Sequence, residues 1–316
     1  MPKTTRRGVV PLKTSASIGV DICSFRLESP TMLASGVLGI SFELFSRIIA
    51  GGAGAVVSKS IGLEQREGYK NPTMTGTDAG YLNAIGLANP GADEFSSELE
   101  EHKDRKIPLV ISIFADSAEK FAVLASKFEK YNFLAYELNL SCPHVKDVGS
   151  EIGSDAIEAG NVVRQVKQET KKPVLAKMPA TIINVPEWAK TVEAAGADAI
   201  VAINTIRAMK IDVESSKPIL SNRIGGLSGP AIRPVAVRCV YEIYETVKIP
   251  VIGVGGVYDW QSAIEFLLAG ARAVQIGSAM ADGYLSTFAN VNEGLKSYLV
   301  RKGYSTLEEI IGLAHN

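Results

Sequence analysis

The chain has 316 residues, of which 46% are hydrophobic and 21% charged, and its formal net charge is −1. This composition is typical of a globular chain with a large core, and it excludes wholesale disorder and collagen-like repetition. A near-neutral chain lacks the basic face that neutralises phosphates, so we expect no nucleic-acid partner. The length suits either two domains or one large α/β barrel.

The three cysteines, Cys23, Cys142 and Cys239, stand far apart in the sequence. Their spacing is neither a disulfide framework nor a Cys-x-x-Cys metal pair, so we expect a reducing, cytoplasmic location and no bound metal. No apolar run approaches the roughly 20 residues of a membrane helix. The basic residues 1–10 lack the apolar segment of a secretory signal, and we expect no membrane contact.

In chain order, a short tail leads to a predicted β-hairpin formed by residues 17–22 and 25–27. From residue 31 onward, short β-branched runs alternate with stretches of helical periodicity. The predicted strands cover residues 31–35, 55–58, 109–113, 135–140, 174–177, 199–203, 251–253 and 273–276. The predicted helices lie near residues 41–50, 93–104, 117–130, 151–170, 186–195, 231–247, 259–269 and 286–302.

These repeated strand–helix cycles predict a (β/α)8 (TIM) barrel that forms a single domain over residues 1–316. The alternative is an open, doubly wound sheet, whose first strand is normally followed by Gly-x-Gly-x-x-Gly on a helix. Residues 34–39 read ASGVLG, and this spacing does not match. Long loops follow the second, fourth and sixth strands, at residues 61–92, 143–153 and 206–230, and such loops often cover a site.

Unusual polar residues stand at the C-terminal ends of the predicted strands, where a barrel carries its chemistry. They are Lys59, Ser60, Asn139, Lys177, Asn204 and Thr205. One such lysine alone would more often be solvated, and one asparagine alone could form a turn. A lysine after an apolar run is costly to bury without an anionic partner. Together on one rim, these residues predict a planar, polar, partly anionic ligand.

Cys142 follows the fourth strand directly and precedes a proline, in a loop that contains glycines. Most buried cysteines act as small hydrophobic residues. The position of Cys142 at the predicted rim favours a reactive thiol instead, whereas Cys23 and Cys239 are assigned to packing.

Glycines follow the last two strands, at Gly255-Gly256 and Gly277-Ser278, and the loop after the sixth strand contains Gly229. Glycine lets backbone N–H groups approach a phosphate closely, and barrels often bind phosphate after strands seven and eight. Tight turns would also use glycine, but three clusters at these places favour phosphate. The residues therefore predict a phosphorylated cofactor beside a polar pocket with a cysteine.

From about residue 16 to about residue 300, the sequence resembles the class 1 dihydroorotate dehydrogenase family. The resemblance rests mainly on residues 83–91 (NAIGLANPG) and 137–143 (ELNLSCP). It implies oxidation of dihydroorotate to orotate in pyrimidine biosynthesis with bound FMN. The closer likeness is to the class 1B catalytic subunit, whose second subunit carries FAD and an iron–sulfur cluster and passes electrons to NAD. The family forms homodimers or heterotetramers of this kind.

By position, Cys142 resembles the catalytic base, which takes a proton from the substrate while the flavin N5 accepts the hydride. The residues that resemble substrate contacts are Lys59, Asn83, Ala84, Ile85, Gly86, Leu87, Asn139, Asn204 and Thr205. Those that resemble the FMN site are Ser35, Lys59, Ser60, Ser112, Asn139, Lys177, Ile203, Gly229, Gly255, Gly256, Gly277 and Ser278. Lys177 is expected near the flavin ring, where a cation stabilises the reduced, anionic form.

His144 departs from the family pattern, which commonly has asparagine after Ser-Cys-Pro. Histidine there also resembles the pyrimidine-reducing domain of dihydropyrimidine dehydrogenase, so reduction of another pyrimidine is the alternative activity. A dihydrouridine synthase acting on transfer RNA is less favoured, because the net charge is near zero. A non-catalytic phosphate-binding barrel is also less favoured, because the reactive side chains are all retained. The electron acceptor stays open: the chain has no cysteine cluster for iron–sulfur, so NAD linkage requires another subunit.

Overall fold

A closed barrel of eight parallel strands forms the centre of the computed structural model, which describes residues 15–39, 41–141 and 152–316. Each barrel strand pairs with the next in the chain, and the last returns to the first. The strands are β3 (Thr31–Leu33), β4 (Ala55–Val57), β7 (Leu109–Ile113), β8 (Ala135–Asn139), β9 (Val174–Lys177), β10 (Ala199–Ala202), β15 (Val251–Val254) and β16 (Ala271–Ile276). The predicted (β/α)8 barrel is confirmed.

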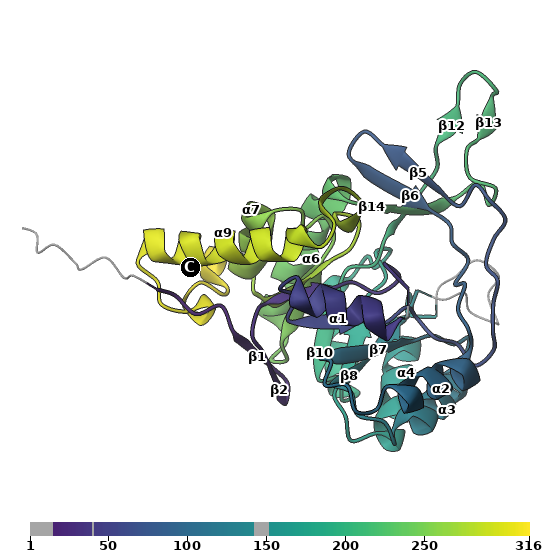
Figure 1. Ribbon diagram of the computed structural model, residues 1–316, viewed down its shortest axis with the longest axis horizontal. Helices are drawn as coiled ribbons and strands as arrows, with labels where there is room; N and C mark the ends of the chain where they lie inside the picture. The colour runs from purple at the N-terminus through teal and green to yellow at the C-terminus, as the bar shows by residue number, and fades with distance from the viewer. Residues whose placement is uncertain (1–14, 40, 142–151) are drawn as a thin grey trace, which may run out of the picture.

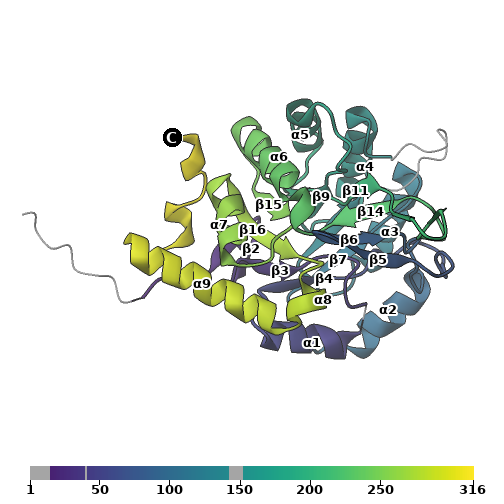
Figure 2. The same cartoon turned by 90° about the horizontal axis from the view of Figure 1, so that it is seen from above.

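Helices surround the barrel, as the view from above in Figure 2 shows. They are α1 (Phe42–Ala50), α2 (Ala92–Glu101), α3 (Ala118–Phe128), α4 (Ala156–Glu169), α5 (Val185–Ala194), α6 (Arg233–Thr246), α7 (Trp260–Leu268) and α9 (Ser286–Lys302), and each overlaps a predicted helix. Helix α3 illustrates the cause: Ser117 caps its first turn, and its buried stripe includes Phe121, Leu124 and Phe128 at helical spacing. Shorter turns are α8 (Met280–Gly283), η1 (Pro230–Ile232), η2 (Leu307–Glu309) and η3 (Leu313–His315).

The barrel strands are buried on both faces, which explains why they read as short, continuous apolar runs. Every residue of β7 is buried, for example. Three long polar side chains break this rule in β8, β9 and β16: Glu137, Lys177 and Gln275 have exposures of 0%, 5% and 1%. Burying a charge or an amide without a hydrogen-bond partner costs free energy, so these three side chains must have partners inside the barrel. Among the described residues, no helix combines the length and apolar character needed to span a bilayer.

The N-terminal hairpin closes the end of the barrel where the strands begin. Strand β1 (Val20–Ile22) pairs with β2 (Phe25–Leu27), which confirms the predicted hairpin with a shorter first strand. Ser17 instead bridges to Thr306 near the C-terminus. At the hairpin turn, Cys23 Sγ donates to the carbonyl of Asp198, the residue before β10, at 3.2 Å. In Figure 1 this hairpin lies to the left of the labelled barrel strands.

At the opposite end, the sequence predicts long loops after β4 and β10, and the structure differs by folding them into one antiparallel sheet. We call this the cap sheet; its order is β11 (Ile206–Ala208), β14 (Gly225–Ser228), β6 (Gly80–Asn83) and β5 (Met74–Thr77). A small hairpin of β12 (Ile211–Asp212) and β13 (Lys217–Pro218) extends from it, away from β1 and β2 in Figure 1. These strands are short and rich in glycine, so they have no periodicity that sequence patterns detect.

Candidate active site

A chain of side-chain hydrogen bonds crosses the C-terminal end of the barrel. We call it the mouth chain; its members are Ser35, Ser60, Ser112, Asn139, Ser141 and Asn204. The hydroxyl of Ser60 lies 3.2 Å from that of Ser35 and 2.8 Å from that of Ser112. Asn139 Nδ2 donates to Ser60 Oγ at 3.1 Å. Asn204 Nδ2 donates to Asn139 Oδ1 at 3.2 Å and to Ser141 Oγ at 2.9 Å.

The sequence assigned the residues of the mouth chain to a site individually, and the structure shows that they are hydrogen-bonded to one another. It also adds Ser141, which was not predicted as a site residue. Ser112 is fully buried, and Ile203 is 1% exposed, so both lie within the barrel wall. The Ser112 side chain therefore supports Ser60 in this structure. Because each amide is held by a neighbour, the two asparagines are fixed before any ligand arrives, and such preorganisation lowers the cost of binding.

Directly below the mouth chain, Glu137, Lys177 and Gln275 form a buried group that we call the ionic cluster. Lys177 Nζ donates to Glu137 Oε1 at 3.0 Å and to Gln275 Oε1 at 3.1 Å. Gln275 Nε2 donates to Glu137 Oε2 at 2.5 Å. Strands β8 and β16 lie on opposite sides of the barrel, so this last bond spans its interior.

The ionic cluster corrects one step of the sequence reasoning. Lys177 does not need an anionic ligand to offset its burial, because Glu137 of the same chain already pairs with it. Glu137 and Gln275 were not predicted as functional residues, although their polar side chains stand out within apolar strands. A carboxylate and a long amide within otherwise apolar strands are costly unless they bond to each other or to a cation.

Lys59 is the contrasting lysine, at the C-terminal end of β4. Its side chain is half-buried, and it has no hydrogen-bond acceptor or ion-pair partner among the described residues. Desolvation lowers the pKa of its ammonium from the ordinary value, because burial disfavours the charged form. Lys59 therefore presents a positive charge at the mouth that an anionic ligand could neutralise.

The cap sheet brings two distant predicted substrate segments together. Asn83 pairs in register with Gly226, and its Nδ2 donates to the Gly226 carbonyl at 3.2 Å. Thr205 packs against the other side of Gly226, where a Cβ would collide with its hydroxyl. Asn83 and Thr205 are thus neighbours across one glycine, although no local pattern in the sequence indicates this.

The segment after Asn83 is held in shape by Asn89, a residue that the sequence assigned no role. Asn89 Oδ1 accepts hydrogen bonds from the backbone of Gly62 and Gly91, at 3.1 and 2.9 Å, and its Nδ2 donates to the Leu87 carbonyl at 2.8 Å. Gly86 has a φ of +78° and lies against the backbone of Tyr69, so a side chain would not fit there. Ala84 is buried, whereas Ile85, Gly86 and Leu87 are partly exposed.

Glycines at the ends of β15 and β16 form a cradle of backbone donors. The N–H groups of Gly255, Gly256, Gly277 and Ser278 have no acceptor among the described residues. Gly255 and Gly256 have φ values of +131° and +82°, and a Cβ on Gly256 would lie 2.7 Å from the Gly229 carbonyl oxygen. Unpaired N–H groups in a concave turn favour an anion, so these residues fit the phosphate of a mononucleotide such as FMN.

The predicted catalytic residue Cys142 and the departing His144 lie outside the described residues, as does most of the loop 143–153. The described residues on either side of this gap, Leu140 and Gly153, are joined by a hydrogen bond. Gly153 N donates to the Leu140 carbonyl at 2.8 Å, and Trp188 Nε1 donates to the Gly153 carbonyl at 2.8 Å. Position 142 also directly follows Ser141, a member of the mouth chain.

The two other cysteines have unreactive thiols, as their assignment to packing suggests. Desolvation, with a further contribution from the Asp198 carboxylate, raises the pKa of Cys23 to about 12. Although Cys23 is exposed as a residue, its sulfur turns inward to a carbonyl. Cys239 is buried, and desolvation raises its pKa as well.

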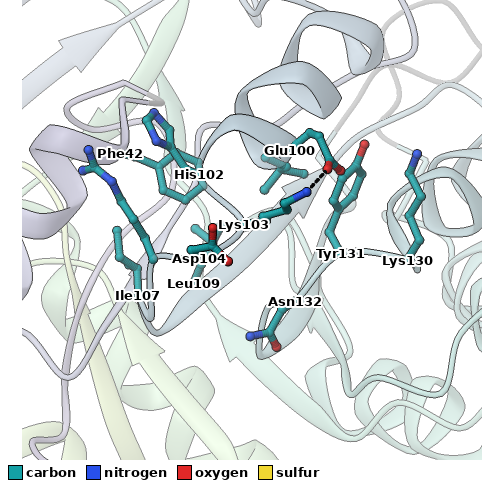
Figure 3. Close-up of a pocket in the computed structure, with 12 residues that line it drawn as sticks. Phe42, Glu100, His102, Lys103, Asp104, Ile107, Leu109, Lys130, Tyr131 and Asn132 are labelled. Carbon is teal, nitrogen blue, oxygen red and sulfur yellow. Dashed lines mark hydrogen bonds and ion pairs between the residues drawn. The ribbon is translucent and has the colours of Figure 1, made fainter.

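A polar pocket of about 300 Å³ lies at the other end of the barrel, among loops that precede β7 and β8 (Figure 3). Two of its basic groups already have partners: Lys103 pairs with Glu100 and Arg105 pairs with Glu43, each at 2.7 Å. Within the described ranges, Glu43, Glu98 and His102 are the one set close enough to suit a metal. We assign no metal there, because Arg105 already neutralises Glu43.

Comparison with known proteins gives a consistent result over nearly the whole chain. The family model described as dihydroorotate dehydrogenase matches residues 17–299. The chain is 46% identical over 298 residues to the dihydroorotate dehydrogenase B (NAD(+)) catalytic subunit of Pyrococcus furiosus, covering 94% of this chain and 99% of the relative. It is 48% identical over 289 residues to the protein of the same name from Methanocella arvoryzae, covering 92% and 95%.

Proposed function

The chain belongs to the dihydroorotate dehydrogenase family, and from this premise we propose that it oxidises dihydroorotate to orotate in de novo pyrimidine biosynthesis with bound FMN. The observation that carries the proposal is the gathering of the mouth chain, the glycine cradle and Lys59, which has no ion-pair partner among the described residues, at one end of the barrel. We propose one domain over residues 1–316, acting in the cytoplasm.

The cofactor-binding role falls to the residues around the glycine cradle. The free N–H groups of Gly255, Gly256, Gly277 and Ser278 would hold the phosphate, next to Gly229. The further residues proposed to contact FMN are Ser35, Lys59, Ser60, Ser112, Asn139, Lys177 and Ile203. When bound, FMN supplies the hydride acceptor that protein side chains lack.

The substrate-binding role falls to the mouth chain and the cap sheet. Dihydroorotate is a flat ring with amide and carbonyl groups and one carboxylate. The amides of Asn83, Asn139 and Asn204 would bond the ring, and the ammonium of Lys59 would neutralise the carboxylate. Thr205 and residues 84–87 would complete the walls of the pocket, since they lie on the same cap-sheet segments.

Cys142 is the proposed base that removes the substrate proton. A free thiol titrates near ~8.5, so the thiolate is a minority form at neutral pH unless its surroundings lower that value. Activity should therefore rise as the pH becomes alkaline. Clamping of the loop at Leu140 and Gly153 supports this role, because a base must be held in place to act efficiently.

The names of the relatives support a partner subunit. We propose that a second subunit with FAD and an iron–sulfur cluster passes electrons to NAD, in a heterotetramer built on a dimer of this chain. Without that partner, the chain would form a homodimer.

The alternative is FMN-dependent reduction of another pyrimidine, which His144 favours and the cation of Lys59 opposes, because such a substrate has no carboxylate for it to bind. A direct test is anaerobic mixing of the purified yellow protein with dihydroorotate or with dihydrouracil. Dihydroorotate should bleach the flavin rapidly, and dihydrouracil should not. Faster bleaching by dihydrouracil would establish the alternative, and a colourless protein that cannot be reconstituted with FMN would refute both.

A further inference from the structure

Glu137 and Gln275 surround Lys177 in a nearly symmetrical way. Each gives one oxygen to the Lys177 ammonium, at 3.0 and 3.1 Å, and a hydrogen bond joins their remaining atoms. An ammonium has three N–H groups, so one is left without an acceptor among the described residues. The two partners differ only in that Glu137 carries a negative charge and Gln275 carries none.

The ionic cluster is therefore neutral as a whole, and it lies next to the proposed flavin site. Lys177 is the last residue of β9 and pairs in register with Asn139 of the mouth chain. The exposed fractions of the Lys177 and Glu137 side chains are 7% and 0%, so water screens their charges little. A ligand bound at the mouth therefore lies close to the Lys177 ammonium, whose positive charge is neutralised by the carboxylate of Glu137.

We propose that Glu137 is a positioning residue that sets the reduction potential of the bound flavin by neutralising Lys177. The proposal rests on FMN binding as proposed above. Reduced flavin is anionic, and an uncompensated cation beside it would stabilise the reduced form over the oxidised one. The carboxylate of Glu137 opposes this effect and keeps the potential lower than Lys177 alone would make it.

The test uses two variants of nearly unchanged shape. Glu137→Gln removes the negative charge and leaves Lys177 between two amides. The exchange variant Glu137→Gln/Gln275→Glu moves the carboxylate to the other side of Lys177, with every hydrogen bond of the cluster still possible. The measurement is the midpoint potential of the bound flavin against a reference dye, at one neutral pH for all variants.

We expect Glu137→Gln to increase the preference for reduced over oxidised FMN at least tenfold, which raises the two-electron potential by about 30 mV. The exchange variant should return to the wild-type potential. Asp198→Asn is the matched control, because it removes a carboxylate from the Lys167–Asp198 pair near the start of β10, at the other end of the barrel. Its potential should equal that of the wild type.

An unchanged potential in FMN-loaded Glu137→Gln would overturn the inference. If that variant does not fold, the exchange variant decides: it must fold and keep the wild-type potential, and failure in either respect also overturns the inference. A wild-type protein that does not hold FMN would instead refute the proposed function, so the two failures are distinguishable.

Discussion

The two ends of the barrel both carry basic, acidic and polar side chains, but they differ in how their basic side chains are paired. At the end where the strands begin, Lys103 and Arg105 are each paired with a glutamate beside a pocket of about 300 Å³. At the end where the strands finish, Lys59 and the cradle N–H groups have no partner among the described residues. A site is thus recognised by unsatisfied polar groups rather than by the presence of a cavity.

The largest effect is expected at the mouth, from Cys142→Ala. Removing the proposed base should lower the rate of dihydroorotate oxidation by about 10²- to 10⁴-fold, the usual contribution of a positioned base. The measurement is single-turnover bleaching of the flavin. FMN content should stay at the wild-type level, because the cradle is untouched, and full activity would remove Cys142 from the mechanism.

Thiol labelling checks the same residue independently. Because their raised pKa values keep Cys23 and Cys239 protonated at neutral pH, an alkylating reagent should modify Cys142 first. Bound orotate should slow that modification. Preferential labelling of Cys23 would contradict the described environment of its sulfur.

A smaller effect is expected from Lys59→Met, which removes the unpaired charge. Loss of a charged hydrogen bond should raise the KM for dihydroorotate about 10- to 100-fold. In the wild type, the KM should rise as the pH passes through the lowered pKa of Lys59, because only the protonated ammonium attracts a carboxylate. The variant should lose this pH dependence, and Lys59→Arg should shift it to higher pH.

Gly153→Ala should have a moderate effect, because a Cβ there collides with the side chain of Leu140. Overpacking of this kind costs about 1–3 kcal/mol of stability. The clamp at the base of the loop would be displaced, so kcat should fall while FMN content is kept. The control is Gly303→Ala, where a Cβ meets no atom within 4 Å. Gly303 has a positive φ, so alanine strains the backbone there without touching the loop. Equal losses of kcat in both variants would contradict a specific role for the hydrogen bond between Leu140 and Gly153 in catalysis.

The smallest effect is expected at the opposite end, from Lys103→Ala. Its ion pair with Glu100 is exposed, and exposed pairs contribute little. The ratio kcat/KM should stay within about twofold of the wild type, since the residue is far from the mouth. A large loss of activity would contradict the view that only the end where the strands finish takes part in catalysis.

Local sequence patterns predict the barrel and place most of the polar side chains at its C-terminal end. Alternation of β-branched runs with helical periodicity is a local property, so each barrel strand and each helix around the barrel could be located without knowing its neighbours. Polar residues such as Asn139 and Lys177 could be assigned to one rim, because all parallel strands of a barrel finish at the same end.

Local patterns do not show which of these residues touch, because the contacts depend on how the barrel closes. Gln275 and Glu137 are 138 residues apart, and Asn83 and Gly226 are 143 apart, yet each pair is hydrogen-bonded. The cap sheet likewise forms from segments that have no strand pattern of their own. Barrel closure brings distant side chains within bonding distance, and a sequence read locally has no information on that closure. For this reason local patterns located both lysines, and only the fold shows that Glu137 neutralises Lys177 while Lys59 has no such partner among the described residues.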